Sequence, residues 1–201
     1  MGITTDHPLR MQADRCVLLL VDYQTRLLPS LEGGGNVVAE AIRLADVARL
    51  LDVPVVGTEQ NPAGLGPNVD AIRSRCNSTL PKMHFDACED GLTEHLTTVA
   101  GAERPDVVMA GCEAHVCLLQ TTLGLLRAGR RVWVVAPACG SRDATDHRLA
   151  MQRLQQAGAV VVSGEMVVFE WLHHCRHPRF KDVLALVRHR IERMPAIDRT
   201  V

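Results

Sequence analysis

The sequence predicts an α/β fold, with a doubly wound, mainly parallel sheet of about six strands and helices on both faces. Short apolar runs alternate along the chain with longer segments whose apolar residues recur at helical spacing. The first run, CVLLLV at residues 16–21, is apolar throughout, as in a parallel strand that is covered on both sides. Strands that alternate with helices are joined most economically by right-handed crossovers, which produce such a sheet.

The individual elements follow one another in that alternating order. Residues 1–14 are polar and unpatterned and predict a loosely held arm, ahead of a single domain at 15–195 and a tail at 196–201. Asn36, which follows three glycines, is a good N-cap for the first helix, and a loop rich in proline and glycine is expected at 61–77. Further strands are expected at 54–57, 107–110, 131–135 and 159–162, and further helices near 91–99, 116–126, 150–157, 165–173 and 180–191.

Length and charge limit the class of partner. A chain of 201 residues is long enough to bury roughly 70% of its unfolded surface in a core of its own. Apolar residues make up 47% of the chain and charged residues 22%, and the net charge of -1 provides no attraction for nucleic acid or an anionic membrane. We therefore expect a small-molecule substrate, with neither nucleic acid nor a membrane as partner.

The cysteines and the first apolar run indicate the compartment. The seven cysteines are an odd number without a C-x-x-C pair, which argues against a disulfide framework or a zinc ribbon and fits a reducing environment. The first apolar run is too short for a signal peptide, and no run approaches the length of a transmembrane helix. The sequence therefore predicts a cytoplasmic protein.

The turn GCEAHVCL at residues 111–118 joins an apolar run to a helical pattern and presents Cys117. A thiol in the first turn of a helix lies near unpaired backbone N–H groups and the positive end of the helix dipole, and both favour the nucleophilic thiolate. The same N–H groups could receive an oxyanion that develops on a substrate carbonyl. The alternative is that Cys117 is a small buried hydrophobic residue, as free cysteines usually are.

Three polar residues stand where predicted strands end. Asp22 follows the first strand, Glu59 lies at the end of the second, and Cys117 follows the strand at 107–110. In doubly wound sheets, ligands bind beyond the carboxyl ends of the strands. This placement makes a catalytic role for Cys117 as well supported as a role in the core.

Several segments along the chain form one recognisable set. They are LLLVDYQ at 18–24, TEQNPAGLG at 58–66, KMHFD at 82–86, GCEAHVC at 111–117, VAPACGSR at 135–142, AMQRLQQAGA at 150–159 and HPRFK at 177–181. Taken together, these segments resemble the isochorismatase-like cysteine hydrolase family, from about residue 15 to residue 190, and most closely its metal-free branch, the isochorismatase domain-containing proteins. The resemblance implies a three-layer, Rossmann-like fold, no cofactor and a homo-oligomer. The apolar residues at 167–172 also hint at a subunit interface.

The resemblance implies a catalytic triad of Asp22, Lys82 and Cys117. Elementary chemistry agrees, because Asp22 can take the thiol proton and return it to the leaving group, while Lys82 favours anionic forms and water then hydrolyses the thioester. The family also carries a cis peptide bond before its nucleophile helix, which falls at Cys112-Glu113 in this chain. We predict that the N–H groups of Glu113 and Cys117 form the oxyanion hole.

Other polar residues are candidates for the substrate pocket, and no metal ligand is expected. Nicotinamidases of this family hold a metal with an Asp-x-His motif and a further histidine, but residues 58–66 contain no histidine. The run HHCRH at 173–177 matches no zinc spacing, and surface or interface residues are expected there. His115 is two positions before Cys117 and would lie on another side of a helix, so it is not expected to act as the base of Cys117. The pocket candidates are Tyr23, Gln24, Glu59, Gln60, His84 and His115.

The sequence therefore predicts a metal-independent thiol hydrolase that cleaves a small amide, ureido or ester compound through an acyl-Cys117 intermediate. One alternative is cleavage of an isochorismate-like enol ether with Asp22 as general acid. The resemblance speaks against it, because family members with that activity often lack the cysteine. The other alternative is a non-catalytic, oligomeric binding protein that retains the pocket.

Overall fold

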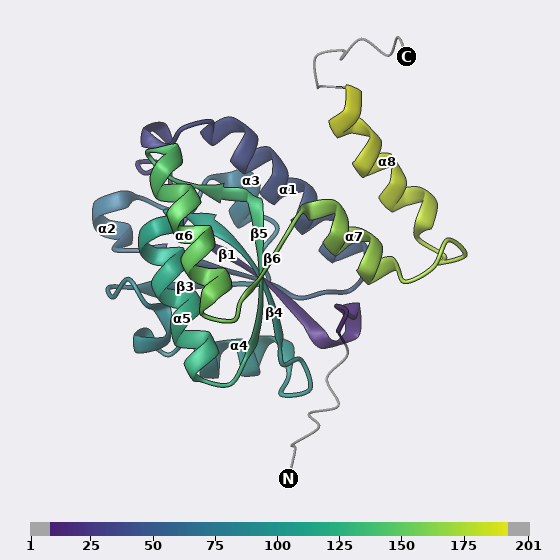
Figure 1. Ribbon diagram of the computed structural model, residues 1–201, viewed down its shortest axis with the longest axis horizontal. Coiled ribbons are helices and arrows are strands. Elements are labelled where there is room, and N and C mark those ends of the chain that lie inside the picture. The colour runs from purple at the N-terminus through teal and green to yellow at the C-terminus, as the bar shows by residue number, and fades with distance from the viewer. Residues whose placement is uncertain (1–8, 193–201) are drawn as a thin grey trace.

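A six-stranded, all-parallel sheet forms the centre of the computed structural model, which describes residues 9–192 (Figure 1). The strands lie side by side in the order β3-β2-β1-β4-β5-β6. The chain thus builds one half of the sheet outward from β1 and then the other half outward from β4, which confirms the doubly wound prediction. The strands are β1 (Cys16–Val21), β2 (Val55–Gln60), β3 (Ser78–Lys82), β4 (Asp106–Cys112), β5 (Arg131–Gly140) and β6 (Val160–Val162).

Helices cover both faces of the sheet and complete the three layers (Figure 1). One face carries α1 (Gly34–Leu50), α7 (Gly164–Leu172) and α8 (Phe180–Glu192). The other face carries α4 (Leu92–Ala100), α5 (Leu119–Arg127) and α6 (Ala144–Gln156). Two short helices, α2 (Pro62–Leu65) and α3 (Asp70–Arg73), lie within the segment that was expected to be a loop.

Each face of the sheet has its own apolar core, because successive side chains of a strand point to opposite sides. In β1, Leu18 and Leu20 pack with α1, whereas Val17, Leu19 and Val21 pack with residues of α4 and α5. All six residues of β1 are buried, as the uninterrupted apolar run predicts. Polar side chains can therefore gather only where the strands end.

Strand β3 is the element that the sequence pattern does not reveal. Its residues, STLPK, include a proline and a lysine and show no apolar alternation. The structure places β3 at the edge of the sheet, paired with β2 alone. A proline is tolerated in an edge strand because one side of that strand needs no hydrogen bonds to a neighbour.

Two local expectations near the N-terminus are wrong. Helix α1 begins at Gly34 instead of after Asn36, because Gly33 occupies the N-cap position with a left-handed φ of 63° that glycine adopts readily. Met11, in the segment predicted to be a loose arm, is fully buried, and its N–H donates to Glu170 Oε2 at 2.7 Å. This end of the arm is therefore packed on the domain; residues 1–8 and the predicted tail at 196–201 lie outside the described residues.

The apolar residues of α7 belong to the core of the chain itself. Val167, Val168, Trp171 and Leu172 are buried, and only Phe169 is substantially exposed, at 43%. The hint of a subunit interface at 167–172 is therefore wrong for all but Phe169. The run at 173–177 forms a mostly exposed turn after α7, which confirms the expectation of surface residues there. None of the helices within residues 9–192 has the length and apolar character that a membrane crossing requires.

Candidate active site

The three residues of the predicted triad come together at the carboxyl edge of the sheet. Lys82 is the last residue of β3, and Asp22 directly follows β1. Cys117 lies in a single π turn, Ala114–Leu118, that connects β4 to α5. Strands β1 and β4 lie next to each other at the point where the strand order reverses, the usual place for a ligand in a doubly wound sheet.

Asp22 and Lys82 form a buried ion pair. Lys82 Nζ lies 2.8 Å from Asp22 Oδ2, and neither side chain has exposed surface. Asp22 Oδ1 accepts a hydrogen bond from Thr58 Oγ1 at 2.7 Å. Lys82 Nζ donates to Gln60 Oε1 at 2.5 Å and to the His84 carbonyl at 3.3 Å. Because a buried charge is tolerated only when it is paired and hydrogen-bonded, these contacts account for a full ion pair in the interior.

The backbone at Asp22 directs its carboxylate into this cluster. Strand alternation would carry residue 22 to the face covered by α1, the side to which Leu20 points. Asp22 instead has a left-handed backbone, with φ at 56°, which interrupts the alternation. Aspartate adopts this conformation more readily than most residues do. The carboxylate thereby meets Thr58 of β2, the neighbouring strand, and Lys82 of β3, the strand beyond it.

Strand alternation separates Gln60 from Glu59. Val56 packs with the core on the α4 and α5 side, and Thr58 and Gln60 continue along that side two and four residues later. Glu59 faces the opposite side, where its Oε1 accepts from the Asn68 N–H at 2.9 Å. Gln60 therefore belongs to the candidate site, whereas Glu59 holds the loop that follows β2.

Cys117 lies against the ion pair as a thiol. Its side chain is 5% exposed, and Sγ lies 3.9 Å from Gln60 Oε1. Burial, and after it the negative charge of Asp22, raises the pKa of the Cys117 thiol to about 12, although Lys82 opposes this shift. Burial and the charge of Asp22 thus act against the preference for a thiolate that is expected at a helix start. Nucleophilic attack by this sulfur requires a base, and Asp22 is the adjacent carboxylate.

The backbone before Cys117 has the conformation expected from the resemblance. The peptide bond between Cys112 and Glu113 is cis. The Glu113 carbonyl accepts hydrogen bonds from the N–H groups of Val116 and Leu118, at 3.1 and 3.2 Å. Single π turns of this kind occur frequently at functional sites. The turn replaces the ordinary first helical turn that the sequence predicts.

Two side chains tie this turn to the segment that follows β5. Arg142 Nε lies 2.5 Å from Glu113 Oε1. His115 Nδ1 lies 3.0 Å from Ser141 Oγ, and Arg142 Nη2 lies 3.4 Å from His115 Nε2. His115 Nε2 also lies 3.8 Å from Asp146 Oδ2. The His115 side chain is thus directed toward Ser141, Arg142 and Asp146.

The remaining pocket candidates are placed away from Cys117. Tyr23 is fully buried in the core on the α1 side, and its hydroxyl donates to the Ala138 carbonyl at 2.5 Å. Gln24, also fully buried, donates to the carbonyls of Gln60 and Gly66 and accepts from the Gln60 N–H. The His84 side chain is 57% exposed and lies 3.1 Å from Asp90, so only its carbonyl reaches the cluster.

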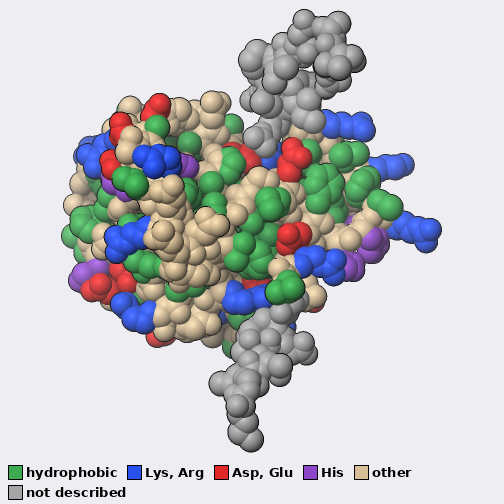
Figure 2. Space-filling view, in the orientation of Figure 1, with side chains coloured by type: hydrophobic (Ala, Val, Ile, Leu, Met, Phe, Trp, Pro, Cys, Tyr) green, Lys and Arg blue, Asp and Glu red, His purple; other side chains and the backbone are tan. Residues whose placement is uncertain are grey.

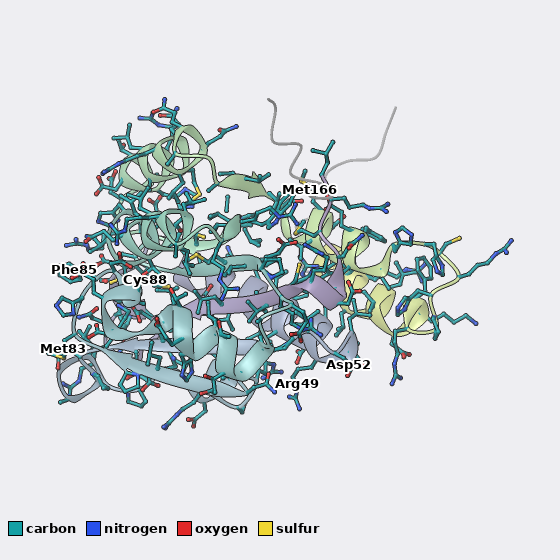
Figure 3. All side chains as sticks on the ribbon, turned by 90° about the horizontal axis from the view of Figure 1, so that it is seen from below. Arg49, Asp52, Met83, Phe85, Cys88 and Met166 are labelled. Atoms are coloured by element: carbon teal, nitrogen blue, oxygen red, sulfur yellow. The ribbon has the colours of Figure 1, made fainter. Side chains whose placement is uncertain are left out.

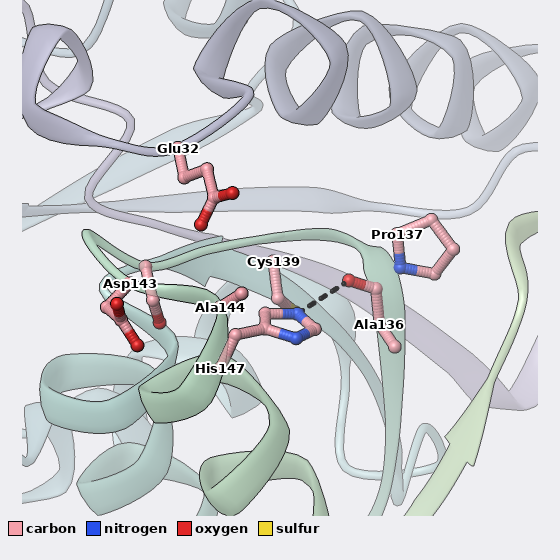
Figure 4. A pocket seen from close by; sticks show the side chains of 8 residues that line it. Glu32, Ala136, Pro137, Cys139, Asp143, Ala144 and His147 are labelled. Carbon is pink, nitrogen blue, oxygen red and sulfur yellow. Dashed lines mark hydrogen bonds between the residues drawn. The ribbon is translucent and has the colours of Figure 1, made fainter.

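Two surface cavities lie at this edge of the sheet, and neither is lined by Cys117. The first, of about 320 Å³, adjoins the cluster because Lys82 lines it together with Pro62, Pro81 and Met83. Exposed apolar side chains, Met83 and Phe85, lie at the same end of the molecule (Figure 3). The second cavity, of about 260 Å³, opens beyond β5 (Figure 4). Its wall includes Glu32, Asp143 and His147, and His147 Nε2 donates to the Ala136 carbonyl at 3.2 Å.

Comparison with known proteins agrees with the fold and shows the family. The family model for the isochorismatase domain matches residues 16–166. The chain belongs to the isochorismatase domain family. Human isochorismatase domain-containing protein 2 is 36% identical over 175 residues, which cover 86% of this chain and 82% of the human protein. Mouse isochorismatase domain-containing protein 2A is 33% identical over 179 residues, covering 89% and 85% of the two chains.

Solved structures of similar proteins share the fold of this chain. A structure described as MAR1 ribonuclease from Caenorhabditis elegans is 31% identical, with a TM-score of 0.83 over 96% of this chain and 97% of that one. YcaC from Pseudomonas aeruginosa, described with covalent acrylamide, shares the fold at 22% identity, with a TM-score of 0.81 over 92% and 98% of the two chains. A cysteine hydrolase from Pseudomonas syringae also shares the fold, at 14% identity, with a TM-score of 0.71 over 83% and 98%.

Thr58 is a residue of this cluster that no sequence motif singles out. The Thr58 hydroxyl donates a hydrogen bond to Asp22 Oδ1 at 2.7 Å, whereas Lys82 contacts the other carboxylate oxygen, Oδ2, at 2.8 Å. The alternation of β2 could have identified it, because Thr58 and Gln60 point to the same side of the strand as Val56.

Among the described residues, no group of three or more His, Cys, Asp or Glu side chains is arranged to hold a metal ion.

Proposed function

We propose that this isochorismatase domain protein is a metal-independent thiol hydrolase that cleaves a small amide, ureido or ester compound through an acyl-Cys117 intermediate. The observation that carries the proposal is the buried Asp22–Lys82 ion pair, at 2.8 Å, against which the Cys117 thiol lies. A nucleophile with an adjacent base and a third orienting group is the usual arrangement for covalent catalysis.

In the first half of the reaction, Asp22 removes the thiol proton while Sγ of Cys117 forms a bond to the substrate carbonyl carbon. Removal and attack are coupled, because burial and Asp22 raise the pKa of the thiol to about 12. The carbonyl electrons move onto oxygen, which the N–H groups of Glu113 and Cys117 receive. The tetrahedral species then expels the amine or alcohol, which takes the proton from Asp22.

In the second half, Asp22 takes a proton from water as the water oxygen attacks the thioester carbonyl. The carbon–sulfur bond then breaks, the acid product leaves, and the proton on Asp22 returns to the sulfur. Lys82 supplies positive charge next to Asp22 and the sulfur throughout, so neither anionic form stands alone in the interior.

The relatives and the charge distribution support a small substrate and sulfur chemistry. The Pseudomonas aeruginosa YcaC structure holds acrylamide covalently, and the Pseudomonas syringae relative is described as a cysteine hydrolase. The description of the Caenorhabditis elegans structure as a ribonuclease raises RNA as another substrate. The net charge of -1, and the mixture of acidic and basic side chains on the face in Figure 2, favour a small molecule over RNA.

The test is a panel of small amides, ureido compounds and esters, together with isochorismate and RNA, assayed with the wild type, Cys117→Ala and Asp22→Asn. We expect turnover of a compound from the first three groups that both substitutions abolish, with an acyl adduct on the Cys117 peptide in mass spectra. Full turnover by Cys117→Ala would refute the thiol mechanism. Cleavage of isochorismate that only Asp22→Asn abolishes would establish the enol-ether alternative. No turnover with any compound, despite tight binding of one, would favour a binding protein.

We further propose that the protein is a homo-oligomer of a reducing, cytoplasmic compartment. The Escherichia coli YcaC structure, which shares the fold at 21% identity, is described as an octameric hydrolase. All seven cysteines of this chain are free thiols. Light scattering should give a mass that is a multiple of 22.0 kDa, and a monomer would remove the proposal of an oligomer.

A further inference from the structure

Gln60 lies between the cation and the thiol of the candidate site without carrying a charge. Its Oε1 accepts from Lys82 Nζ at 2.5 Å and lies 3.9 Å from Cys117 Sγ. The side chain is buried, with 8% of the residue exposed. One amide oxygen is thus the shared neighbour of two of the three residues to which the proposed function assigns a chemical role.

The orientation of this amide is fixed from both of its ends. Gln60 Nε2 donates to the Met83 carbonyl at 2.7 Å, which directs Oε1 toward Lys82. The Gln60 backbone is held by Gln24, whose side-chain amide accepts from the Gln60 N–H and donates to the Gln60 carbonyl, both at 2.9 Å. An amide with both ends engaged cannot rotate without breaking hydrogen bonds in the interior, which is costly.

We propose that Gln60 is a positioning residue, whose oxygen holds the Lys82 ammonium against Asp22 and gives the Cys117 thiol a neutral neighbour. The inference rests on the proposed function, in which Cys117 is the nucleophile and Asp22 its base. Neutrality matters because a carboxylate at position 60 would compete with Asp22 for the single ammonium. It would also add a second negative charge beside the sulfur, where Asp22 already disfavours the thiolate.

The two isosteric replacements of Gln60 should change the thiol in opposite directions. Gln60→Glu adds negative charge, so alkylation of Cys117 by iodoacetamide at pH 9 should become about tenfold slower, as expected for a pKa increase of about one unit. Gln60→Met removes the oxygen dipole and leaves Lys82 free to face the sulfur, so alkylation should become severalfold faster. Both variants should lower kcat more than they change KM, because Lys82 loses its fixed place beside Asp22.

The alkylation rate is measured by mass spectrometry of the Cys117 peptide, because the chain contains seven cysteines. Gln152, which is exposed on α6, provides the control, since Gln152→Glu and Gln152→Met make the same chemical changes away from the site. Both control variants should react like the wild type. Thermal melts followed by circular dichroism verify that each variant is folded.

The opposite signs are what a purely structural role would not produce, because loosening alone would move both Gln60 variants in the same direction. Equal rates in both variants and the wild type, or a shift of both in one direction, would overturn the proposal. If Gln60→Glu does not fold, the Gln60→Met rate decides, and a rate at or below that of the wild type overturns it. This outcome is separate from failure of the proposed function, which is judged by turnover in Cys117→Ala, since alkylation needs no substrate.

Discussion

The two ends of strand β1 carry similar chemical groups in different arrangements. At the carboxyl end, the Cys117 thiol lies beside Asp22, which pairs with Lys82. At the amino end, the thiol of Cys16 lies near Asp106, which pairs with Arg131 where β4 and β5 begin. Burial raises the pKa of Cys16 to about 11, and the charge of Asp106 contributes to this shift. Each end therefore combines a buried thiol, a carboxylate and a cation.

The difference between the ends lies in how each carboxylate is occupied. Arg131 binds both oxygens of Asp106, with Nε at Oδ1 and Nη2 at Oδ2, in the bidentate geometry that suits a guanidinium. The oxygens of Asp22 are divided between Thr58 and Lys82, which come from separate strands, and the ammonium is a compact charge shared with further acceptors. The guanidinium pair fixes the start of two strands, whereas the lysine pair leaves a carboxylate that can accept a proton. The same three groups therefore yield a structural element at one end and a candidate catalytic element at the other.

The largest expected difference is between the two thiols. Cys117→Ala should lower turnover by roughly 10⁴-fold or more, because removal of a nucleophile leaves only binding and oxyanion stabilisation. Cys16→Ala should leave kcat and KM close to wild-type values and lower only the stability, by about 1 kcal/mol for a small cavity. Steady-state kinetics and urea unfolding of both variants make the comparison. Loss of turnover in Cys16→Ala with an intact fold would contradict it.

Replacement of the two carboxylates should give the second largest difference in turnover. Asp22→Asn should lower turnover by roughly 10³-fold, within the range of general acid–base contributions. It should also make alkylation of Cys117 about tenfold faster, because the charge that disfavours the thiolate is gone. Asp106→Asn should destabilise the fold and leave both rates unchanged. Slower alkylation in Asp22→Asn, measured on the Cys117 peptide, would show that Asp22 does not act on the thiol.

The cations provide a smaller contrast, in stability. Lys82→Met should cost about 3–5 kcal/mol in the free energy of unfolding, because it leaves Asp22 as an unpaired charge with no exposed surface. Asp106 also has no exposed surface, but Arg131→Met should cost less, roughly 1–3 kcal/mol, because the Arg131 side chain is 22% exposed and its removal lets water reach Asp106. Urea denaturation at pH 7 measures both values. Equal losses would mean that the depth of burial does not distinguish the two pairs.

The fold can be predicted from the sequence where burial determines the pattern of apolar residues. The run at 16–21 is apolar because both sides of β1 are covered, and the structure reproduces its bounds as Cys16–Val21. The edge strand β3 cannot be predicted in this way, because an edge strand requires no alternation of apolar residues. Because β3 is not predicted, the sequence pattern does not place Lys82 at a strand end, and only the family resemblance assigns it to the site.

The site was accessible in part for a similar reason. Strand ends single out Asp22 and Cys117, and the resemblance adds Lys82, but the choice between Glu59 and Gln60 needs the phase of β2 up to its last residue. Continued from Val56, that phase selects Gln60. The pKa of the Cys117 thiol cannot be predicted from the sequence, because it depends on burial and on the Asp22 carboxylate, 95 positions earlier in the chain.

The smallest expected effect is shared by both ends of β1 and appears at alkaline pH. Cys16 and Cys117 have pKa values raised from 9.0 to about 11 and about 12 in the folded state. Between pH 9 and these values, the unfolded chain releases the protons that the folded chain retains, so the free energy of unfolding decreases as pH rises. Each thiol contributes a slope of up to about 1.4 kcal/mol per pH unit, and none of it is expressed below pH 8.

Single replacements separate the contributions of the two ends. Cys16→Ala and Cys117→Ala should each make the decrease in stability between pH 9 and pH 10.5 less steep, and by similar amounts, although only Cys117→Ala affects turnover. Urea unfolding at half-unit pH intervals gives the slopes. A variant with the wild-type slope would place the pKa of its thiol near the ordinary value. For Cys117, that result would show that burial and Asp22 do not raise the pKa of its thiol, and it would make the two ends of β1 less alike than their composition suggests.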